Sequence, residues 1–251
     1  MSQEFIVAQI SDSHLFGEAN GLHHGSNVYK NLIKVLMHIK QLPQVDVIVF
    51  TGDLTQDHSE ASYQLFVNAF AECSITIPVY YVPGNHDELA LLKRFLNSAP
   101  FQQESVIETP SWQIFLVNSK SDTPAGSVSS EQLKNIEKKI DSSKTQLLLM
   151  HHHPLDVGYF IDRHGLVNKE EFHRFIATNP SIRAVGCGHI HQALTLSMSP
   201  GAQATPLFTC PATSIQFDRH CDTVANNGQG PGFRCFTLKE DKQLSSDVFF
   251  I

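Results

Sequence analysis

Five short apolar segments of the sequence are each followed closely by polar residues of the types that bind metal ions. These residues are Asp12 and His14, Asp53, Asn85, His151, and His189 with His191. Carboxylate, amide and imidazole donors without a cysteine favour Fe, Mn, Zn or Co over a thiolate site. A single zinc site needs three or four ligands. Seven donors with one bridging carboxylate instead suit two ions about 3.5–4 Å apart.

The elements that would position these residues alternate between strands and helices. Apolar runs predict strands at Phe5–Ile10, Val45–Phe50, Pro78–Val82, Leu147–Met150 and Ala184–Cys187, and an antiparallel pair at Val106–Ile107 and Gln113–Asn118. Helices are expected over Val28–Ile39, Ser59–Ala71, Glu88–Leu96, Ser129–Ile140 and Asn168–Ala177. After Gly188 we expect only short strands, at Leu194–Met198, Leu207–Cys210, Ser214–Phe217, Phe233–Leu238 and Asp247–Ile251. A single α/β domain spanning residues 1–251, with two mixed sheets, fits this order. Because the carboxyl ends of strands in open α/β sheets face one crevice, the polar residues should converge there.

Composition narrows the class of protein. The 251 residues carry 18 Lys and Arg against 25 Asp and Glu, a formal charge of −7, and no basic block suggests a nucleic-acid partner. The apolar runs are too short to span a bilayer, and the first residues lack the pattern of a secretory signal. Five scattered cysteines without a C-x-x-C pair indicate reduced thiols. We therefore expect a cytoplasmic protein with no membrane association, and the oligomeric state stays open.

The order of the polar motifs resembles that of a known family. D-x-H, G-D, G-N-H-D, H-H and G-H-x-H, in this order, are the motifs of the calcineurin-like metallophosphoesterases. The stretches "ISDSHLF", "TGDLTQDHS", "VPGNHD", "LLLMHHHPL" and "CGHIHQ" are similar to those of the bacterial class III 3',5'-cyclic AMP phosphodiesterases. The resemblance runs over nearly the whole chain and implies a four-layer αββα sandwich. It departs at Leu22–Ser26, where "LHHGS" replaces a "LLGV"-like stretch.

The resemblance also implies a site and a reaction. Asp12, His14, Asp53 and His191 would hold one metal, and Asp53, Asn85, His151 and His189 the other, with Asp53 bridging. The metals would be two divalent or mixed-valence ions of Fe, Mn, Zn or Co. The implied reaction is hydrolysis of 3',5'-cyclic AMP to 5'-AMP, with a metal-bound hydroxide as the nucleophile. The catalytic residues would be Asp53, Asn85 and His86, where a protonated His86 is a hypothetical general acid. The cyclic nucleotide would lie against His14, Asp53, Asn85, His86, His151 and His191.

Two alternatives remain beside this prediction. The same metal motifs would serve glycerophosphodiesters, 2',3'-cyclic nucleotides or phosphomonoesters, because they describe only the phosphate-facing half of the site. A non-catalytic protein-binding scaffold is the more distant alternative. The sequence leaves open whether five further histidines reach the cleft, namely His23, His24, His152, His153 and His220.

Overall fold

The computed structural model describes residues 4–198 and 204–251 and contains two mixed β-sheets. The first sheet has the order β13-β12-β1-β4-β5, formed by Leu244–Phe250, Gly232–Lys239, Glu4–Ile10, Val47–Phe50 and Val79–Tyr81. The second has the order β10-β11-β9-β8-β7-β6, formed by Thr195–Ser197, Pro206–Thr209, Ile182–Cys187, Thr145–Met150, Trp112–Val117 and Val106–Glu108. In the first sheet β1, β4 and β5 are parallel, and in the second β7, β8, β9 and β11 are parallel. These parallel strands deliver their carboxyl ends to the same region.

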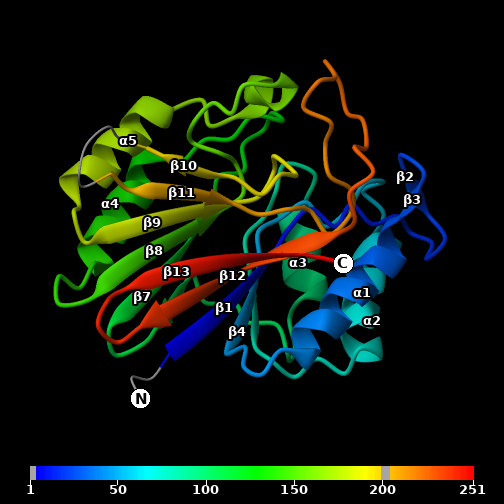
Figure 1. The fold of residues 1–251 in the computed structure, drawn as a ribbon, viewed down its shortest axis with the longest axis horizontal. Helices are drawn as coiled ribbons and strands as arrows, with labels where there is room; N and C mark the ends of the chain where they lie inside the picture. The colour runs from blue at the N-terminus through cyan, green and yellow to red at the C-terminus, as the bar shows by residue number, and fades with distance from the viewer. Residues whose placement is uncertain (1–3, 199–203) are drawn as a thin grey trace.

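Helices cover the outer face of each sheet, which makes four layers (Figure 1). The first sheet is covered by α1 (Val28–Gln41), α2 (Glu60–Glu72) and α3 (Leu89–Phe95), and the second by α4 (Ser130–Lys139) and α5 (Lys169–Thr178). The αββα sandwich implied by the resemblance is confirmed.

Strand alternation explains how the two sheets pack together. In β1, Ala8 faces the helices of its own sheet, whereas Val7 faces the second sheet. In β8, Leu148 faces α4 and α5, and Leu147 faces the first sheet. Since successive side chains of a strand point to opposite faces, a strand buried on both faces reads as a continuous apolar run.

The predicted helices are confirmed to within two residues at each end, and side chains cap three of them. Asn27, Ser59 and Ser129 accept hydrogen bonds from backbone N–H groups in the first turns of α1, α2 and α4. Two short elements were not predicted, namely the hairpin of β2 (Leu22–His23) and β3 (Ser26–Asn27) and a 3₁₀ helix at Phe160–His164. Among the cysteines, Cys221 is only half-buried, whereas the other four are buried.

The strand predicted at Ser214–Phe217 is wrong. Within it only Phe217 makes an isolated bridge, to Asn226. The N–H groups of Thr213 and Ser214 instead donate to the carbonyls of Ser11 and Asp12. Because these hydrogen bonds go to the loop after β1, the segment closes over that loop rather than extending a sheet.

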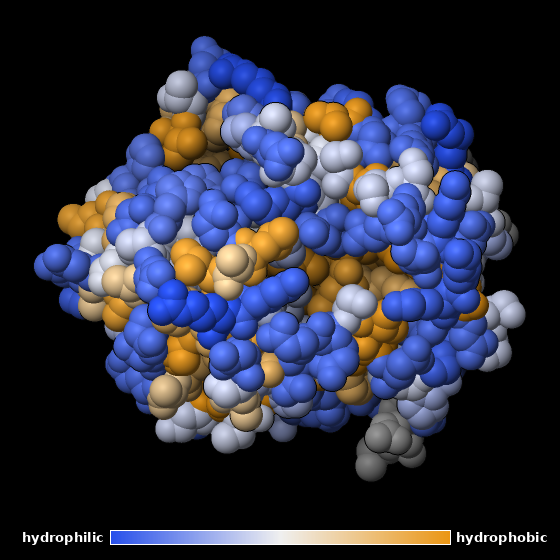
Figure 2. Space-filling model, turned by 180° about the vertical axis from the view of Figure 1, so that it is seen from behind, coloured by the Kyte–Doolittle hydropathy of each residue, from blue (hydrophilic) through white to orange (hydrophobic). Residues whose placement is uncertain are grey.

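The face of the molecule opposite to that of Figure 1 is mainly hydrophilic, with apolar residues in small groups (Figure 2). No helix among the described residues is long and apolar enough to cross a membrane.

Candidate metal centre

The structure brings all seven predicted donor residues together at the carboxyl ends of five strands. They follow β1, β4 and β5 of the first sheet and β8 and β9 of the second. All of them are buried except Asn85, which is partly exposed. Five of the seven, Asp12, His14, Asp53, His189 and His191, have positive φ angles of 45–68°. Such left-handed backbone costs about 1–3 kcal/mol for each non-glycine residue and concentrates at functional sites.

The first group of donor atoms surrounds Nε2 of His191. Nε2 of His14 lies 3.2 Å from it, and Oδ1 of Asp12 lies 3.3 Å from it. Oδ2 of Asp53 lies 3.7 Å from Nε2 of His14.

The second group of donor atoms surrounds Nε2 of His151. Oδ1 of Asn85 and Nδ1 of His189 each lie 3.1 Å from it, and Oδ2 of Asp53 lies 3.4 Å from it. The other carboxylate oxygen of Asp53 accepts the backbone N–H of His86 at 2.8 Å. Oδ2 of Asp53 is therefore free to belong to both groups.

The hydrogen bonds made by the imidazole rings leave their Nε2 atoms suited to bind cations. Nδ1 of His151 and Nδ1 of His191 each donate to a backbone carbonyl, of Thr51 and Ile215, at 2.7 Å. Since a carbonyl only accepts, each neutral ring presents a lone pair at Nε2 to the donor group. Nδ1 of His14 similarly faces Oε1 of Gln56 at 2.8 Å.

Each group brings together nitrogen and oxygen atoms that can offer lone pairs to a cation. The buried Oδ1 of Asp12 has no hydrogen-bond partner, although Oδ2 of the same carboxylate accepts the N–H of His189 at 3.0 Å. An unpartnered buried carboxylate oxygen is costly unless a cation satisfies it. The residues present therefore fit a pair of nitrogen- and oxygen-bound cations.

The electrostatics of the site favour neutral rings at His14 and His189, an ionised Asp53 and a proton on His151. Burial holds the pKa of His14 and of His189 well below the usual value. Burial opposes ionisation of Asp53, but the charge of His151 and other nearby histidines outweighs it and lowers the pKa of Asp53. Burial likewise opposes the charge of His151, and the carboxylate of Asp53 more than offsets it, which raises the pKa of His151 to about 9. A cation on these atoms would compete with that proton.

Asp87 supports the site from behind, a role that the sequence analysis did not assign. Its carboxylate is fully buried and accepts the backbone N–H groups of Asp53, Leu54 and Gly84, each at 2.8 Å. A Cβ at Gly84 would lie 2.2 Å from Oδ1 of Asp53, so only glycine fits there. Asp87 was visible as the last residue of G-N-H-D, and Gln56 lies in the stretch "TGDLTQDHS", but neither was predicted to hold or orient a donor residue.

The neighbouring histidines His152 and His153 orient other groups. Nδ1 of His152 lies 2.8 Å from Oγ of Ser119, and Nε2 lies 3.2 Å from the carbonyl of Pro124, so both ring nitrogens have partners. The ring of His153 stacks on His189 with centroids 5.5 Å apart, and its Nε2 lies 3.2 Å from Asp162. His220 is exposed.

His86 lies at the border between the donor groups and an adjoining cavity. Its ring is half-buried and meets His14 edge-on, with centroids 4.9 Å apart. Burial lowers its pKa, and its Nδ1 has no hydrogen-bond partner. The cavity measures about 480 Å³ and is lined by Asn85, His86 and Lys120, among others. The amine of Lys120 donates to the backbone carbonyl of Asn85 at 3.0 Å. This cavity has a size typical of small-molecule sites.

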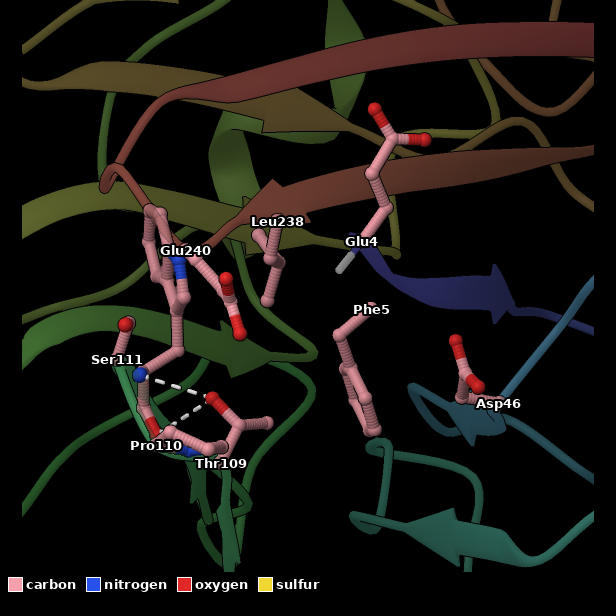
Figure 3. Close-up of a pocket in the computed structure, with 9 residues that line it drawn as sticks. Glu4, Phe5, Asp46, Thr109, Pro110, Ser111, Leu238 and Glu240 are labelled. Atoms are coloured by element: carbon pink, nitrogen blue, oxygen red, sulfur yellow. Dashed lines mark hydrogen bonds between the residues drawn. The ribbon is translucent and has the colours of Figure 1, made fainter. Parts of the chain in front are cut away.

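A second, smaller pocket of about 60 Å³ lies at the opposite ends of the strands (Figure 3). It is lined by residues at the starts of β1 and β7, including Phe5 and Trp112, together with Glu4, Asp46 and Glu240. Hydrogen bonds between Thr109 and Trp112 close the turn beside it. It contains none of the predicted donor residues and is separate from the metal centre.

The four-layer sandwich and the clustered histidines and carboxylates define the metallophosphoesterase class. A family model described as calcineurin-like phosphoesterase matches residues 5–193, and the chain belongs to this hydrolytic family. It is 51% identical over 253 residues to a "Probable cyclic nucleotide phosphodiesterase" of Colwellia psychrerythraea, covering 100% of this chain and 96% of that protein. It is 34% identical to the "3',5'-cyclic adenosine monophosphate phosphodiesterase CpdA" of Escherichia coli, covering 96% of this chain and 88% of that one.

Solved structures share the fold. A dimetal phosphatase from Danio rerio superposes with a TM-score of 0.67 at 12% identity, covering 98% of both chains. A purple acid phosphatase from yellow lupin superposes with a TM-score of 0.63 at 14% identity, covering 99% of this chain and 54% of that chain. At such identities the likeness concerns the fold alone.

Proposed function

We propose that the chain hydrolyses 3',5'-cyclic AMP to 5'-AMP at a dinuclear metal centre. The observation that carries the proposal is the division of seven donor residues into two groups that share Oδ2 of Asp53. Asp12, His14 and His191 complete one group, and Asn85, His151 and His189 complete the other. The names of the relatives from Colwellia psychrerythraea and Escherichia coli support the choice of substrate.

Bound cations would supply Lewis-acid stabilisation of the phosphoryl group and a water whose pKa falls towards ~7. The chain's own residues hold and orient the substrate. Asn85 and His86 lie where one phosphoryl oxygen would face the second donor group, and Asn85 is fixed there through Lys120. We propose that an N–H of His86 donates a hydrogen bond to a phosphoryl oxygen. Transfer of a proton to the leaving 3' oxygen requires the protonated ring, which burial disfavours at neutral pH because it lowers the pKa of His86.

The metal identity belongs to the same proposal. Imidazole, amide and carboxylate donors accept Fe, Mn, Zn or Co, in divalent or mixed-valence pairs. We also propose a cytoplasmic location, which the five free cysteines support.

The test is a comparison of substrates with one preparation of metal-reconstituted protein. With Mn²⁺ added and a chelated control beside it, cyclic AMP should be converted to 5'-AMP, and Asp53→Ala should abolish the conversion. Asp222→Ala, which removes an exposed carboxylate, is the matched control and should behave as the unmodified chain. The panel includes cyclic GMP, 2',3'-cyclic AMP, glycerophosphodiesters and bis-p-nitrophenyl phosphate.

Each alternative predicts a distinct result. Turnover of bis-p-nitrophenyl phosphate or a glycerophosphodiester without turnover of cyclic AMP would refute cyclic AMP as the substrate but would still support the proposed metal centre. Failure of every substrate in protein with two bound ions would favour the protein-binding scaffold.

A further inference from the structure

The strands β2 and β3 form a hairpin that closes through a two-residue turn. His23 pairs with Ser26, so the turn consists of His24 and Gly25, with φ angles of 44° and 81°. Positive φ at both central residues is the mark of a type I′ turn, which matches the twist of the flanking strands. Leu22 is 59% exposed, whereas His23 is half-buried. By strand alternation His23 therefore points inward where Leu22 points to solvent.

Side-chain hydrogen bonds fix this hairpin to the body of the protein. Asn31 donates from Nδ2 to Oγ of Ser26 and to the carbonyl of Ser214, both at 2.8 Å. Asn27 donates to the carbonyl of Ala19 at 3.0 Å and also caps α1. Because Ser26 pairs with His23, these bonds hold the backbone of His23 in place.

The ring of His23 lies parallel to that of His14. The ring centroids are 5.2 Å apart and the planes differ by 7°. His23 is also near enough to His86 and His191 for electrostatic interaction with both. It belongs to none of the groups of converging donor atoms in the described residues, and its nitrogens make no hydrogen bond there. The ring therefore borders the metal centre with its nitrogens available to a ligand.

We propose that His23 contacts the nucleoside part of a cyclic nucleotide held at the metal centre and determines specificity. This inference rests on the proposed function. The phosphate would occupy the donor groups, and the ribose and base must extend beyond them. His23 stands beside His14 at the edge of the site. Its nitrogens offer a hydrogen bond to a ribose hydroxyl or to a polar atom of the base, and the rigid hairpin limits the entropy lost in forming it.

The test compares His23→Ala with His24→Ala in metal-reconstituted protein. His24 is exposed and lies in the same turn, and its ring meets that of His23 edge-on with centroids 4.8 Å apart. Its variant therefore reports damage to the hairpin together with the loss of this ring contact. His23→Ala should raise KM for cyclic AMP about tenfold, as for the loss of one hydrogen-bonded contact. It should alter kcat less, and raise KM for bis-p-nitrophenyl phosphate less than for cyclic AMP. Calorimetry should give a similar weakening of 5'-AMP binding, with bound metal equal to that of the unmodified chain.

Three results would overturn the inference. Loss of metal from His23→Ala would make the residue a support for His14. Equal changes for cyclic AMP and bis-p-nitrophenyl phosphate, or no change in either, would remove its role in specificity. If the unmodified chain fails to hydrolyse cyclic AMP, the proposed function fails and the inference fails with it. If the unmodified chain hydrolyses cyclic AMP and the variant matches it, only the inference is wrong.

Discussion

The buried carboxylate of Asp87 holds the backbone of Asp53 in place. Its Oδ2 accepts the N–H of Asp53 and its Oδ1 accepts the N–H of Leu54, both at 2.8 Å. Burial and the nearby charge of Asp53 raise the pKa of Asp87 to about 6, so these hydrogen bonds form although the two carboxylates repel each other. The left-handed conformation of Asp53, with φ 57°, is retained because its neighbours are tied in this way.

Asp87→Asn should therefore destabilise the protein and loosen the metal centre. The amide keeps one acceptor oxygen and directs its NH₂ at a backbone donor, leaving a buried N–H unsatisfied. We expect a loss of about 2–4 kcal/mol in the free energy of unfolding. Urea denaturation of chelated protein measures this loss without a contribution from bound metal. Asp222→Asn is the control, and equal stability of the two variants would contradict the role of Asp87.

Gln56 orients His14, a predicted metal donor, without joining the donor groups itself. Its Oε1 lies 2.8 Å from Nδ1 of His14 and selects the tautomer with the lone pair at Nε2. Gln56→Ala should weaken metal binding by about 10–100-fold, as expected for a residue behind a histidine ligand. Its effect on unfolding of the chelated protein should be small, because the residue is only partly buried.

Mn²⁺ titration of Gln56→Ala measures that loss, and Gln64→Ala on α2 is the control. Among the described residues, the side chain of Gln64 hydrogen-bonds only to Asn68 on the same helix, and Gln64 is exposed. Unchanged metal affinity in Gln56→Ala would show that burial alone orients His14.

That the seven predicted donor residues would lie together was predictable from the sequence, because each follows shortly after an apolar strand. The topology then places those strand ends together, as for Asp12 after β1 and His151 after β8. The supporting residues Asp87 and Gln56 could not be predicted in this way, because the residues that they support lie far away in the chain and are reached by single hydrogen bonds. Ile215 illustrates this limit, because its carbonyl orients His191, whereas its β-branched neighbourhood predicted a strand. The local sequence pattern indicates which side chains are buried and whether an element has the period of a helix or a strand. It does not indicate which distant carbonyl a side chain will hydrogen-bond.

Gly84→Ala should impair catalysis more than folding. Its Cβ would lie 2.2 Å from Oδ1 and 2.3 Å from the backbone nitrogen of Asp53, so the bridging residue must shift. We expect kcat/KM to fall by about 10²-fold or more, since displacement by 1 Å can cost that much. The far-ultraviolet circular dichroism should stay that of the unmodified chain.

The control for this prediction is Gly228→Ala. Gly228 has φ 84° with nothing within 4 Å of a Cβ, so its variant carries backbone strain without a clash. Equal losses of activity in both variants would attribute the effect at Gly84 to something other than contact with Asp53.

Asp162 makes stability depend on pH in the acidic range. Burial opposes its charge, but hydrogen bonds from His153 and from the N–H groups of Val157 and Gly158 outweigh it and lower its pKa to about 2. The folded-state value lies below the ordinary 3.8, so the ionised carboxylate stabilises the folded state. This stabilisation is complete above about pH 4 and disappears as the pH falls towards about 2. Asp162→Asn should therefore lower Tm at pH 7 by about 2–4 °C for each kcal/mol lost, and by progressively less below pH 4.

Thermal unfolding of chelated protein at pH 7, 4 and 3 measures this convergence. The chelator removes the separate effect of acid on metal binding, and Asp222→Asn is the control because its carboxylate is exposed. A Tm difference that stays constant from pH 7 to pH 3 would mean that the charge of Asp162 does not contribute to the stability of the folded state. Because His153 stacks on the predicted metal donor His189, the same variant should also weaken metal binding at pH 7. That effect should stay below the one caused by Gln56→Ala, since Asp162 touches no donor residue directly.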